Sequence, residues 1–133
     1  RTVDELVDST LYVKYQPKDA EWRVHVFAHQ DEEYTDVQKK VKRKDYEGEH
    51  NRQIRNHQNG YIYQRQNLNI PDGLTDLAVE VIERFNLHFG AVDIIQYRDR
   101  FYALEVNTAP GLEGTTLDIY SEQLRKMIEG YNL

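Results

Sequence analysis

The 133-residue chain contains no cysteine, which excludes disulfide bonds, thiolate zinc sites and a cysteine nucleophile. No apolar run approaches the about 18 residues that a membrane-spanning helix needs. The start of the chain carries no basic-plus-apolar signal peptide. Only seven glycines and three prolines are present, so we expect no long flexible linker. These absences predict one folded domain, and we expect it in the cytoplasm.

Positive charge is also scarce, because 17 Lys and Arg residues stand against 23 Asp and Glu residues and give a net charge of -6. Such a balance disfavours a nucleic-acid coat or a membrane-surface binder. One segment differs, since residues 39–55 hold seven basic and three acidic side chains. A solvated loop is the ordinary explanation of such a segment. A nucleic-acid site there is the weaker alternative, because the rest of the chain repels phosphate.

What the sequence does contain is enough apolar material for a core, with 39% hydrophobic residues and ten tyrosines. Alternation of apolar and polar residues predicts an extended strand over residues 22–29. In it, one face should carry Trp22, Val24, Val26 and Ala28, and the other Arg23, His25, Phe27 and His29. Further strands are predicted over residues 11–15, 34–42, 61–64, 92–96 and 101–106.

Two helices are predicted from apolar residues at steps of three and four. The first runs from Leu74 to Phe85, with Asp72 as its N-cap. The second covers residues 117–128, and its inward side chains should be Leu117, Tyr120, Leu124, Met127 and Ile128. A further helix is expected to end within residues 2–8. The order of strands and helices predicts an α+β fold with a mainly antiparallel sheet and two packing helices.

Polar side chains interrupt two of the predicted strands. Asp93 lies among apolar residues, and Glu105 and Asn107 are two residues apart, so both point to one face of the sheet. Burying such groups is costly unless a cation arrives, and their oxygen atoms suit Mg²⁺, which commonly shares its coordination with nucleotide phosphate. The alternative is a solvated sheet face, or a structural carboxylate in which Glu105 pairs with Arg98 or Arg100.

The runs GAVDII (residues 90–95) and FYALEVNTAPGL (residues 101–112) resemble the metal-binding end of the ATP-grasp superfamily. The family pattern is an acid in one strand, then Glu-x-Asn-x-x-Pro-Gly at the end of the next. The D-alanine–D-alanine ligases and the ribosomal-protein glutamate ligases are the most similar branches. The resemblance implies that Asp93, Glu105 and Asn107 hold Mg²⁺ between the phosphates of ATP. Ala91 stands where D-alanine–D-alanine ligases carry an arginine, which favours the glutamate-ligase branch.

The N-terminal part of the chain is similar to the family's hinge, which binds adenine through backbone groups. The resemblance implies that Val13, Lys14 and Tyr15 lie along the adenine and that Glu21 binds the ribose hydroxyls. Lys14 departs from the pattern, because many relatives have an acidic residue there. Without the resemblance, Glu21 is interpreted as an ordinary carboxylate at a strand edge.

The resemblance to the glutamate-ligase branch also implies catalytic residues within or next to the basic segment 39–55. In that branch an arginine and an asparagine face the phosphate and the acyl group. The residues implied here are Arg43, Arg55 and Asn56. The planar fork of arginine suits phosphate and carboxylate ligands. The alternative is again a solvated basic loop.

The resemblance implies an ATP- and Mg²⁺-dependent carboxylate–amine ligase that works through an acyl phosphate. Its partners would be a small-molecule or peptide carboxylate and an amine, with nucleic acid and membrane unlikely partners. The alternative is a non-catalytic nucleotide- and metal-binding or scaffold module of the same fold.

We expect residues 1–133 to be a single domain that corresponds to the C-terminal part of an ATP-grasp core. The resemblance runs from about residue 11 to 124, and complete ATP-grasp enzymes carry a substrate domain and a lid with phosphate-binding lysines before this part. The chain is therefore expected to be a fragment, or the partner of a separate lid.

The purified 133-residue chain is predicted not to turn over ATP at an enzyme-like rate. Losing the groups that position the transferring phosphate typically costs orders of magnitude in rate. A coupled ADP-release assay measures this, and sustained ATP-dependent ligation by the chain would contradict the expectation.

Overall fold

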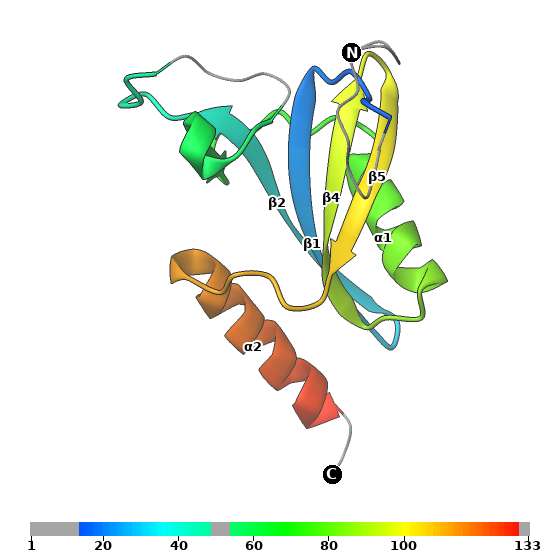
Figure 1. Cartoon of the computed structure of the whole chain (residues 1–133). Coiled ribbons are helices and arrows are strands. Elements are labelled where there is room, and N and C mark those ends of the chain that lie inside the picture. The colour runs from blue at the N-terminus through cyan, green and yellow to red at the C-terminus, as the bar shows by residue number, and fades with distance from the viewer. Residues whose placement is uncertain (1–13, 49–53, 131–133) are drawn as a thin grey trace, which may run out of the picture.

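Residues 14–48 and 54–130 are described by the structure, a computed structural model (Figure 1). This part of the chain forms a five-stranded sheet with the strand order β3-β2-β1-β4-β5. All neighbouring strands are antiparallel. The strands are β1 (Ala20–His29), β2 (Glu32–Lys42), β3 (Tyr61–Gln64), β4 (Phe89–Tyr97) and β5 (Arg100–Asn107). The predicted α+β class with a mainly antiparallel sheet is confirmed.

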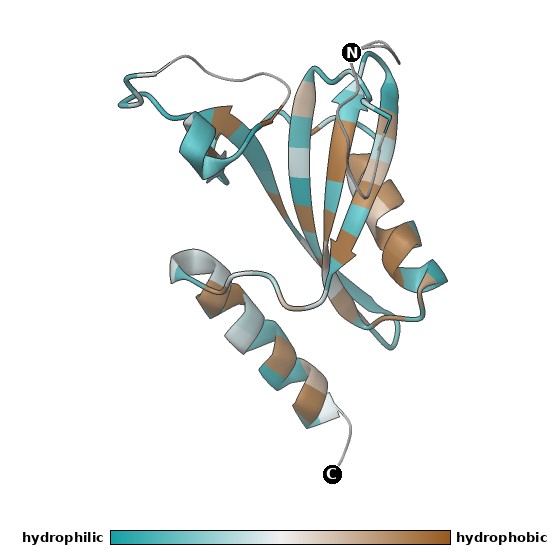
Figure 2. Ribbon diagram, in the orientation of Figure 1, coloured by the Kyte–Doolittle hydropathy of each residue, from teal (hydrophilic) through white to brown (hydrophobic). Residues whose placement is uncertain are grey.

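Helix α1 (Leu74–Arg84) packs on one face of this sheet and encloses the main core. Its buried stripe consists of Leu74, Ala78 and Ile82, which are all inaccessible to solvent. The hydropathy colours of Figure 2 show this helix as largely apolar where it lies along the sheet. The sheet side of the same core is formed by Ala20, Trp22, Val24, Val26, Val37, Val92 and Ile94. The predicted alternation of strand 22–29 therefore gives a continuous apolar face toward α1.

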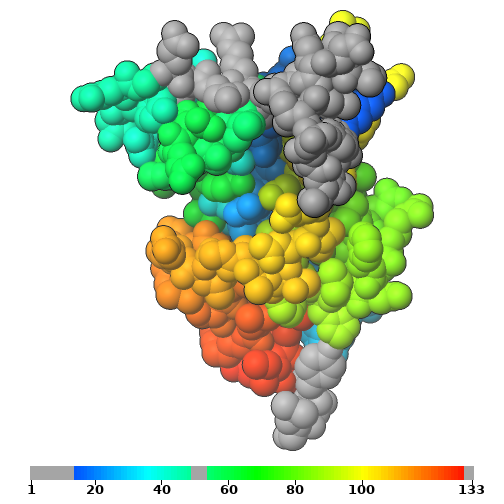
Figure 3. Space-filling view, in the orientation of Figure 1, coloured from blue at the N-terminus to red at the C-terminus, as the bar shows by residue number. Residues whose placement is uncertain are grey.

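Helix α2 (Gly114–Gly130) packs on the opposite face, where Tyr120 and Met127 cover Phe27. In the space-filling view it forms the lower part of the molecule, coloured orange to red (Figure 3). Strand β1 is thus covered on both faces, because Val26 joins the α1 core and Phe27 the α2 cluster. No helix in the described part of the chain is long and apolar enough to cross a membrane.

Three details of the predicted helices are wrong. Helix α1 begins after Gly73, which has a positive φ of 86° and takes the N-cap position in place of Asp72. Phe85 is the residue that caps the C-terminus of the helix, outside its buried stripe, and it is 65% exposed. Leu117 and Ile128 are also exposed, since α2 docks through the stripe that contains Tyr120 and Met127.

The structure describes only part of the N-terminal segment for which a helix and a strand were predicted. The helix predicted within residues 2–8 and residues 11–13 of the predicted strand lie outside the described residues. Lys14 and Tyr15, the rest of that strand, have no regular structure. A short 3₁₀ helix, η2 (His57–Asn59), precedes β3 and was not predicted, because three residues carry no periodic signal.

Ile82→Ala is predicted to lower the free energy of unfolding by about 2–5 kcal/mol, because it opens a cavity at the centre of the α1 core. Phe85→Ala removes more apolar atoms but is predicted to cost under about 1 kcal/mol, because Phe85 is exposed. Urea unfolding of both variants measures the difference. Equal losses would show that α1 packs in another orientation.

Candidate functional site

The sheet face on which α2 packs carries a polar row that crosses four strands. Gln38 on β2, Arg23 on β1, Asp93 on β4 and Glu105 on β5 are successive register partners. Residues directly opposite each other on neighbouring strands point to the same face. Asn107 lies two residues beyond Glu105 on the same strand and shares that face. The structure thus brings the three sequence-predicted metal ligands to one face; Asp93, Glu105 and Asn107 are called the candidate metal site below.

A β-bulge shapes the candidate metal site at its outer strand. The register passes from Asp93 opposite Glu105 to Ile94 opposite Ala103, so Leu104 is an extra residue on β5. Bulges bend a strand and re-aim its side chains, and they are common beside functional sites. Leu104 itself is exposed.

Arg23 is the partner of Asp93, and sequence reasoning missed this contact. Its Nε donates to Asp93 Oδ1 at 2.8 Å and its second terminal nitrogen donates to Oδ2 at 3.1 Å. The two side chains are only 23% and 16% exposed. A bidentate pair of this kind is stronger and more directional than a single ionic contact. Both oxygens of the Asp93 carboxylate are therefore engaged within the protein.

Glu105 and Asn107 have different surroundings. Glu105 is exposed, and within the described residues it forms no ion pair, so the predicted alternative of pairing with Arg98 or Arg100 is wrong. The side-chain oxygen of Asn107 accepts a hydrogen bond from the Ala109 backbone N–H at 2.9 Å. This bond fixes the amide oxygen at the start of the loop that follows β5.

The donor chemistry of the candidate metal site fits Mg²⁺. Two carboxylates and an amide oxygen are hard ligands, and Mg²⁺ is usually held by one or two carboxylates with water and phosphate completing the shell. No group of three or more His, Asp or Glu side chains in the described part of the chain is arranged to hold an ion. The two carboxylates and the amide oxygen leave the six-ligand shell of Mg²⁺ incomplete. Such a site suits an ion that arrives with a phosphate ligand.

Glu21 lies in the next row of the same face and is neutralised by two lysines. Its Oε2 accepts from Lys18 Nζ and its Oε1 from Lys40 Nζ, both at 3.0 Å. Burial acts to raise the pKa of Glu21, but the hydrogen bonds and charges of Lys40 and Lys18 outweigh it and lower the pKa. Glu21 is buried on β1, an internal strand, so its interpretation as a strand-edge carboxylate is wrong. Its ribose contact stays a prediction.

Tyr63 on β3 joins these two groups of charges. Its ring centroid lies 4.5 Å from the Arg23 guanidinium carbon and 5.3 Å from Lys40 Nζ, within the range of cation–π contacts. Burial, followed by the charge of Asp93, raises the pKa of the Tyr63 hydroxyl, so this group stays protonated at neutral pH. The face therefore carries one connected set of charges from Lys18 to Asp93.

The hinge residues lie at the edge of this set. Val13 is outside the described residues. Tyr15 is 47% exposed and lines a cavity of about 600 Å³ beside Lys18, while Lys14 is exposed and has no part in its wall. The other lining residues are Pro17, Asp19, Lys39, Lys40, Val41, Lys42, Arg55, Tyr61 and Tyr97. Five cationic side chains and one carboxylate, Asp19, line this cavity, and Lys18 and Lys40 among them pair with Glu21. The excess of positive charge suits an anion.

The three predicted catalytic residues are held by other parts of the protein. Arg55 donates to the backbone carbonyls of Lys18 and Asp19 at 3.3 and 3.4 Å. The Asn56 side chain accepts from the Asn59 backbone N–H and caps η2. Asn56 also lines a small cavity with Lys40 and Tyr63, which places it near the charged face.

The contacts of Arg43 are with residues outside the candidate metal site. It pairs with Asp45 at 2.9 Å, its NH1 nitrogen lies 3.1 Å from His57 Nε2, and its guanidinium lies over Tyr46. Arg55 and Asn56 thus border the charged face, and Arg43 does not. Their roles toward phosphate or substrate stay predictions.

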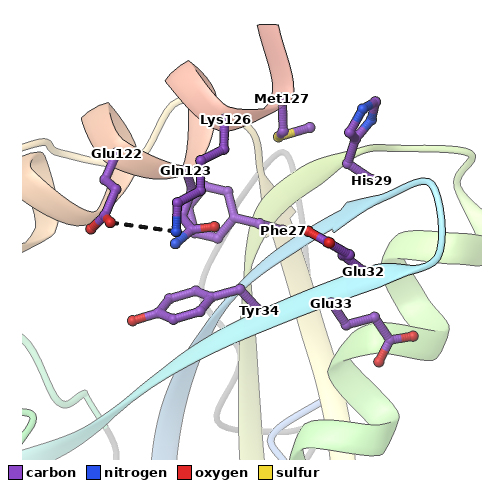
Figure 4. Close-up of a pocket in the computed structure, with 9 residues that line it drawn as sticks. All are labelled: Phe27, His29, Glu32, Glu33, Tyr34, Glu122, Gln123, Lys126 and Met127. Carbon is purple, nitrogen blue, oxygen red and sulfur yellow. Dashed lines mark ion pairs between the residues drawn. The ribbon is translucent and has the colours of Figure 1, made fainter. Parts of the chain in front are cut away.

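Another cavity, of about 400 Å³, lies between α2 and the tip of the β1–β2 hairpin (Figure 4). Phe27 and Tyr34 face it from the strands, and Met127 faces it from α2. Glu122 and Lys126 on its α2 side pair with each other at 3.4 Å. The cavity contains none of the sequence-predicted site residues, so it lies apart from the charged face.

His25 fastens α2 beside the candidate metal site. Its Nδ1 lies 2.8 Å from the Tyr120 hydroxyl and its Nε2 lies 2.6 Å from the Gln38 amide oxygen. Because an amide oxygen only accepts, Nε2 carries the proton and Nδ1 accepts from Tyr120. Burial lowers the pKa of His25, while the contact with Gln38 and the charge of Asp36 act in the opposite direction. His25 is therefore a structural residue that joins β1 to α2.

The chain was compared with models of protein families. The model described as a RimK-like ATP-grasp domain matches residues 19–130. Comparisons with curated proteins and with solved structures gave no match. The matched residues contain the five strands and two α-helices of the described part of the chain, together with the candidate metal site. Val13, Lys14 and Tyr15 precede the match.

His25 predicts a dependence of stability on pH. Its pKa in the folded chain lies below the unfolded value of about 6.5, so the unfolded chain takes up the proton first as the pH falls. The contribution is fully present above pH 7 and is lost as the pH falls toward the folded-state pKa, with a slope of at most about 1.4 kcal/mol per pH unit.

Thermal melts between pH 8 and 5 measure this dependence. His25→Gln should flatten the curve relative to wild type. An unchanged slope in His25→Gln would contradict the role of His25.

Proposed function

The chain belongs to the RimK-like ATP-grasp family, as the resemblance predicted, and we propose that it is the nucleotide- and metal-binding part of an ATP- and Mg²⁺-dependent carboxylate–amine ligase. The observation that carries this proposal is the register of β4 and β5, which sets Asp93 opposite Glu105 with Asn107 on the same face. The family match supports an ATP-dependent ligase type of fold. The substrates and the activity of this chain belong to the proposal.

The proposed reaction has two steps. An oxygen of the substrate carboxylate attacks the γ-phosphorus of ATP, and ADP leaves. The amine nitrogen then attacks the acyl carbon, loses a proton, and phosphate leaves with the former carboxylate oxygen. Positioning and charge stabilisation account for most of the catalysis in such phosphoryl transfers.

Each group of residues has a proposed part. Asp93, Glu105 and Asn107 hold Mg²⁺, which when bound neutralises charge on the phosphates. Glu21 binds the ribose, and this requires it to exchange a contact with Lys18 or Lys40 for the sugar hydroxyls. Val13, Lys14 and Tyr15 lie along the adenine. Arg43, Arg55 and Asn56 face phosphate or the acyl group.

Partners and location complete the proposal. The substrates are a small-molecule or peptide carboxylate and an amine, and the binding of nucleic acid is disfavoured by the net charge of -6. The absence of cysteine agrees with a cytoplasmic protein. Residues 1–133 are proposed to act together with a separate lid and substrate domain.

A non-catalytic nucleotide-binding module is the second candidate. It is favoured by the contacts of two proposed catalytic residues, because Arg43 pairs with Asp45 and Arg55 binds the backbone before β1. Such a module would bind Mg²⁺-ATP without ligation when supplied with the remaining domains. Product analysis with Mg²⁺-ATP, a carboxylate and an amine separates the two candidates.

Glu105→Gln tests the metal site. The substitution keeps size but removes the charge that attracts the cation, and Glu105 is exposed and unpaired among the described residues. We therefore expect apo stability to change by less than about 0.5 kcal/mol, while the increase in melting temperature on adding Mg²⁺-ATP falls by more than half.

Glu83→Gln is the matched control, because Glu83 is an exposed carboxylate on α1, which covers the opposite sheet face. It should retain the full shift. A Glu105→Gln variant that keeps the Mg²⁺-ATP shift would exclude Glu105 as a ligand. A wild-type chain without any Mg²⁺-ATP shift would contradict the proposed nucleotide binding.

A further inference from the structure

Asp93 has no free oxygen in the folded chain, although it is a proposed metal ligand. Both of its carboxylate oxygens accept hydrogen bonds from the Arg23 guanidinium. A cation can bind Asp93 only if one of these hydrogen bonds breaks, or if one carboxylate oxygen contacts both the cation and Arg23. The guanidinium also repels any cation placed between Asp93 and Glu105, because the two carboxylates are cross-strand neighbours. Arg23 therefore competes with the metal for the same carboxylate.

Arg23 has a second support that remains if it leaves Asp93. Its guanidinium carbon lies 4.5 Å from the centroid of the Tyr63 ring, and an aromatic face stabilises a cation without taking its hydrogen-bond donors. Tyr63 stays protonated, since its pKa is raised by burial and by Asp93. Guanidinium binds phosphate in the same forked geometry as carboxylate. A phosphate group on this face would thus offer Arg23 an equivalent partner.

A second pair on the same face shows how a purely structural arginine is held. Arg65 also makes a bidentate contact with an aspartate, Asp36, at 2.9 and 3.0 Å. It donates further to the Thr116 hydroxyl at 2.8 Å and so ties β2 to α2. Asp36 lies opposite His25 on β1, which is not a carboxylate. Asp93 lies opposite Glu105, which is exposed and forms no ion pair with the described residues. Only the Arg23 pair borders an incomplete cation shell.

We propose that Arg23 is a positioning residue that makes metal binding depend on nucleotide. In the absence of nucleotide Arg23 holds Asp93 and keeps the candidate metal site weak. A bound triphosphate offers the guanidinium another anion, and Asp93 is then released to complete the site with Glu105 and Asn107. This inference rests on the proposed function, because it takes these three residues as the metal ligands.

Mn²⁺ binding, followed by the loss of the free-ion electron paramagnetic resonance signal, tests the inference. The variants are wild type, Arg23→Gln and the control Arg65→Gln, each with and without a non-hydrolysable ATP analogue. Wild type should bind Mn²⁺ weakly alone and at least about tenfold more tightly with the analogue. Arg23→Gln should bind Mn²⁺ alone at least about tenfold more tightly than wild type does. Arg65→Gln should behave as wild type.

The outcomes separate this inference from the proposed function. If Arg23→Gln binds Mn²⁺ alone no better than wild type, while wild type responds to the analogue, Arg23 does not control the site and the inference is overturned. If wild type binds Mn²⁺ in neither condition, the metal site and with it the inference are overturned.

A measurement on the unmodified protein covers the case in which Arg23→Gln fails to fold. In the free chain the Nε–H group of Arg23 donates a hydrogen bond to Asp93. The nuclear magnetic resonance signal of this group should keep its position when Mg²⁺ is added alone. It should shift when the ATP analogue and Mg²⁺ are added together. A shift with Mg²⁺ alone, or no shift with both ligands, would contradict the inference.

Discussion

The two hydrogen bonds between Arg23 and Asp93 join the central strands β1 and β4 on the face that bears the candidate metal site. A carboxylate in this position is costly unless a cation neutralises it. The pair meets that requirement from within the chain, and it fixes the direction of Asp93 relative to Glu105. The pair is also connected to the charges around Glu21, because the Tyr63 ring packs against both Arg23 and Lys40.

One face of the sheet forms the apolar core, and the other carries the candidate metal site. Toward α1, side chains such as Val24 and Ile82 form an apolar core without solvent contact. Toward α2, apolar packing is confined to the Phe27 end, and polar contacts such as His25 with Tyr120 fasten the helix. This arrangement leaves Glu105 of the candidate metal site exposed, while the other face of the sheet provides the apolar core.

The parts of the fold that were predictable from sequence are those governed by neighbours along the chain. The alternation in strand β1 and the apolar stripe ending at Ile82 are local patterns, and the spacing of Glu105 and Asn107 put both on one face. The partner of Asp93 was not predictable in this way, because Arg23 is 70 residues away and only the strand register brings the two together. The exposure of Phe85 was missed for the same reason, since tertiary packing decides where a helix leaves the sheet.

The central claim is that Asp93, Glu105 and Asn107 hold the metal of a bound nucleotide. Crystals of the chain grown with Mn²⁺ and a non-hydrolysable ATP analogue, measured for anomalous scattering, test it most directly. The account predicts an anomalous peak beside the side-chain oxygens of these three residues and next to the bound phosphates. A nucleotide bound with its Mn²⁺ elsewhere on the protein, with the Arg23–Asp93 pair intact, would contradict it.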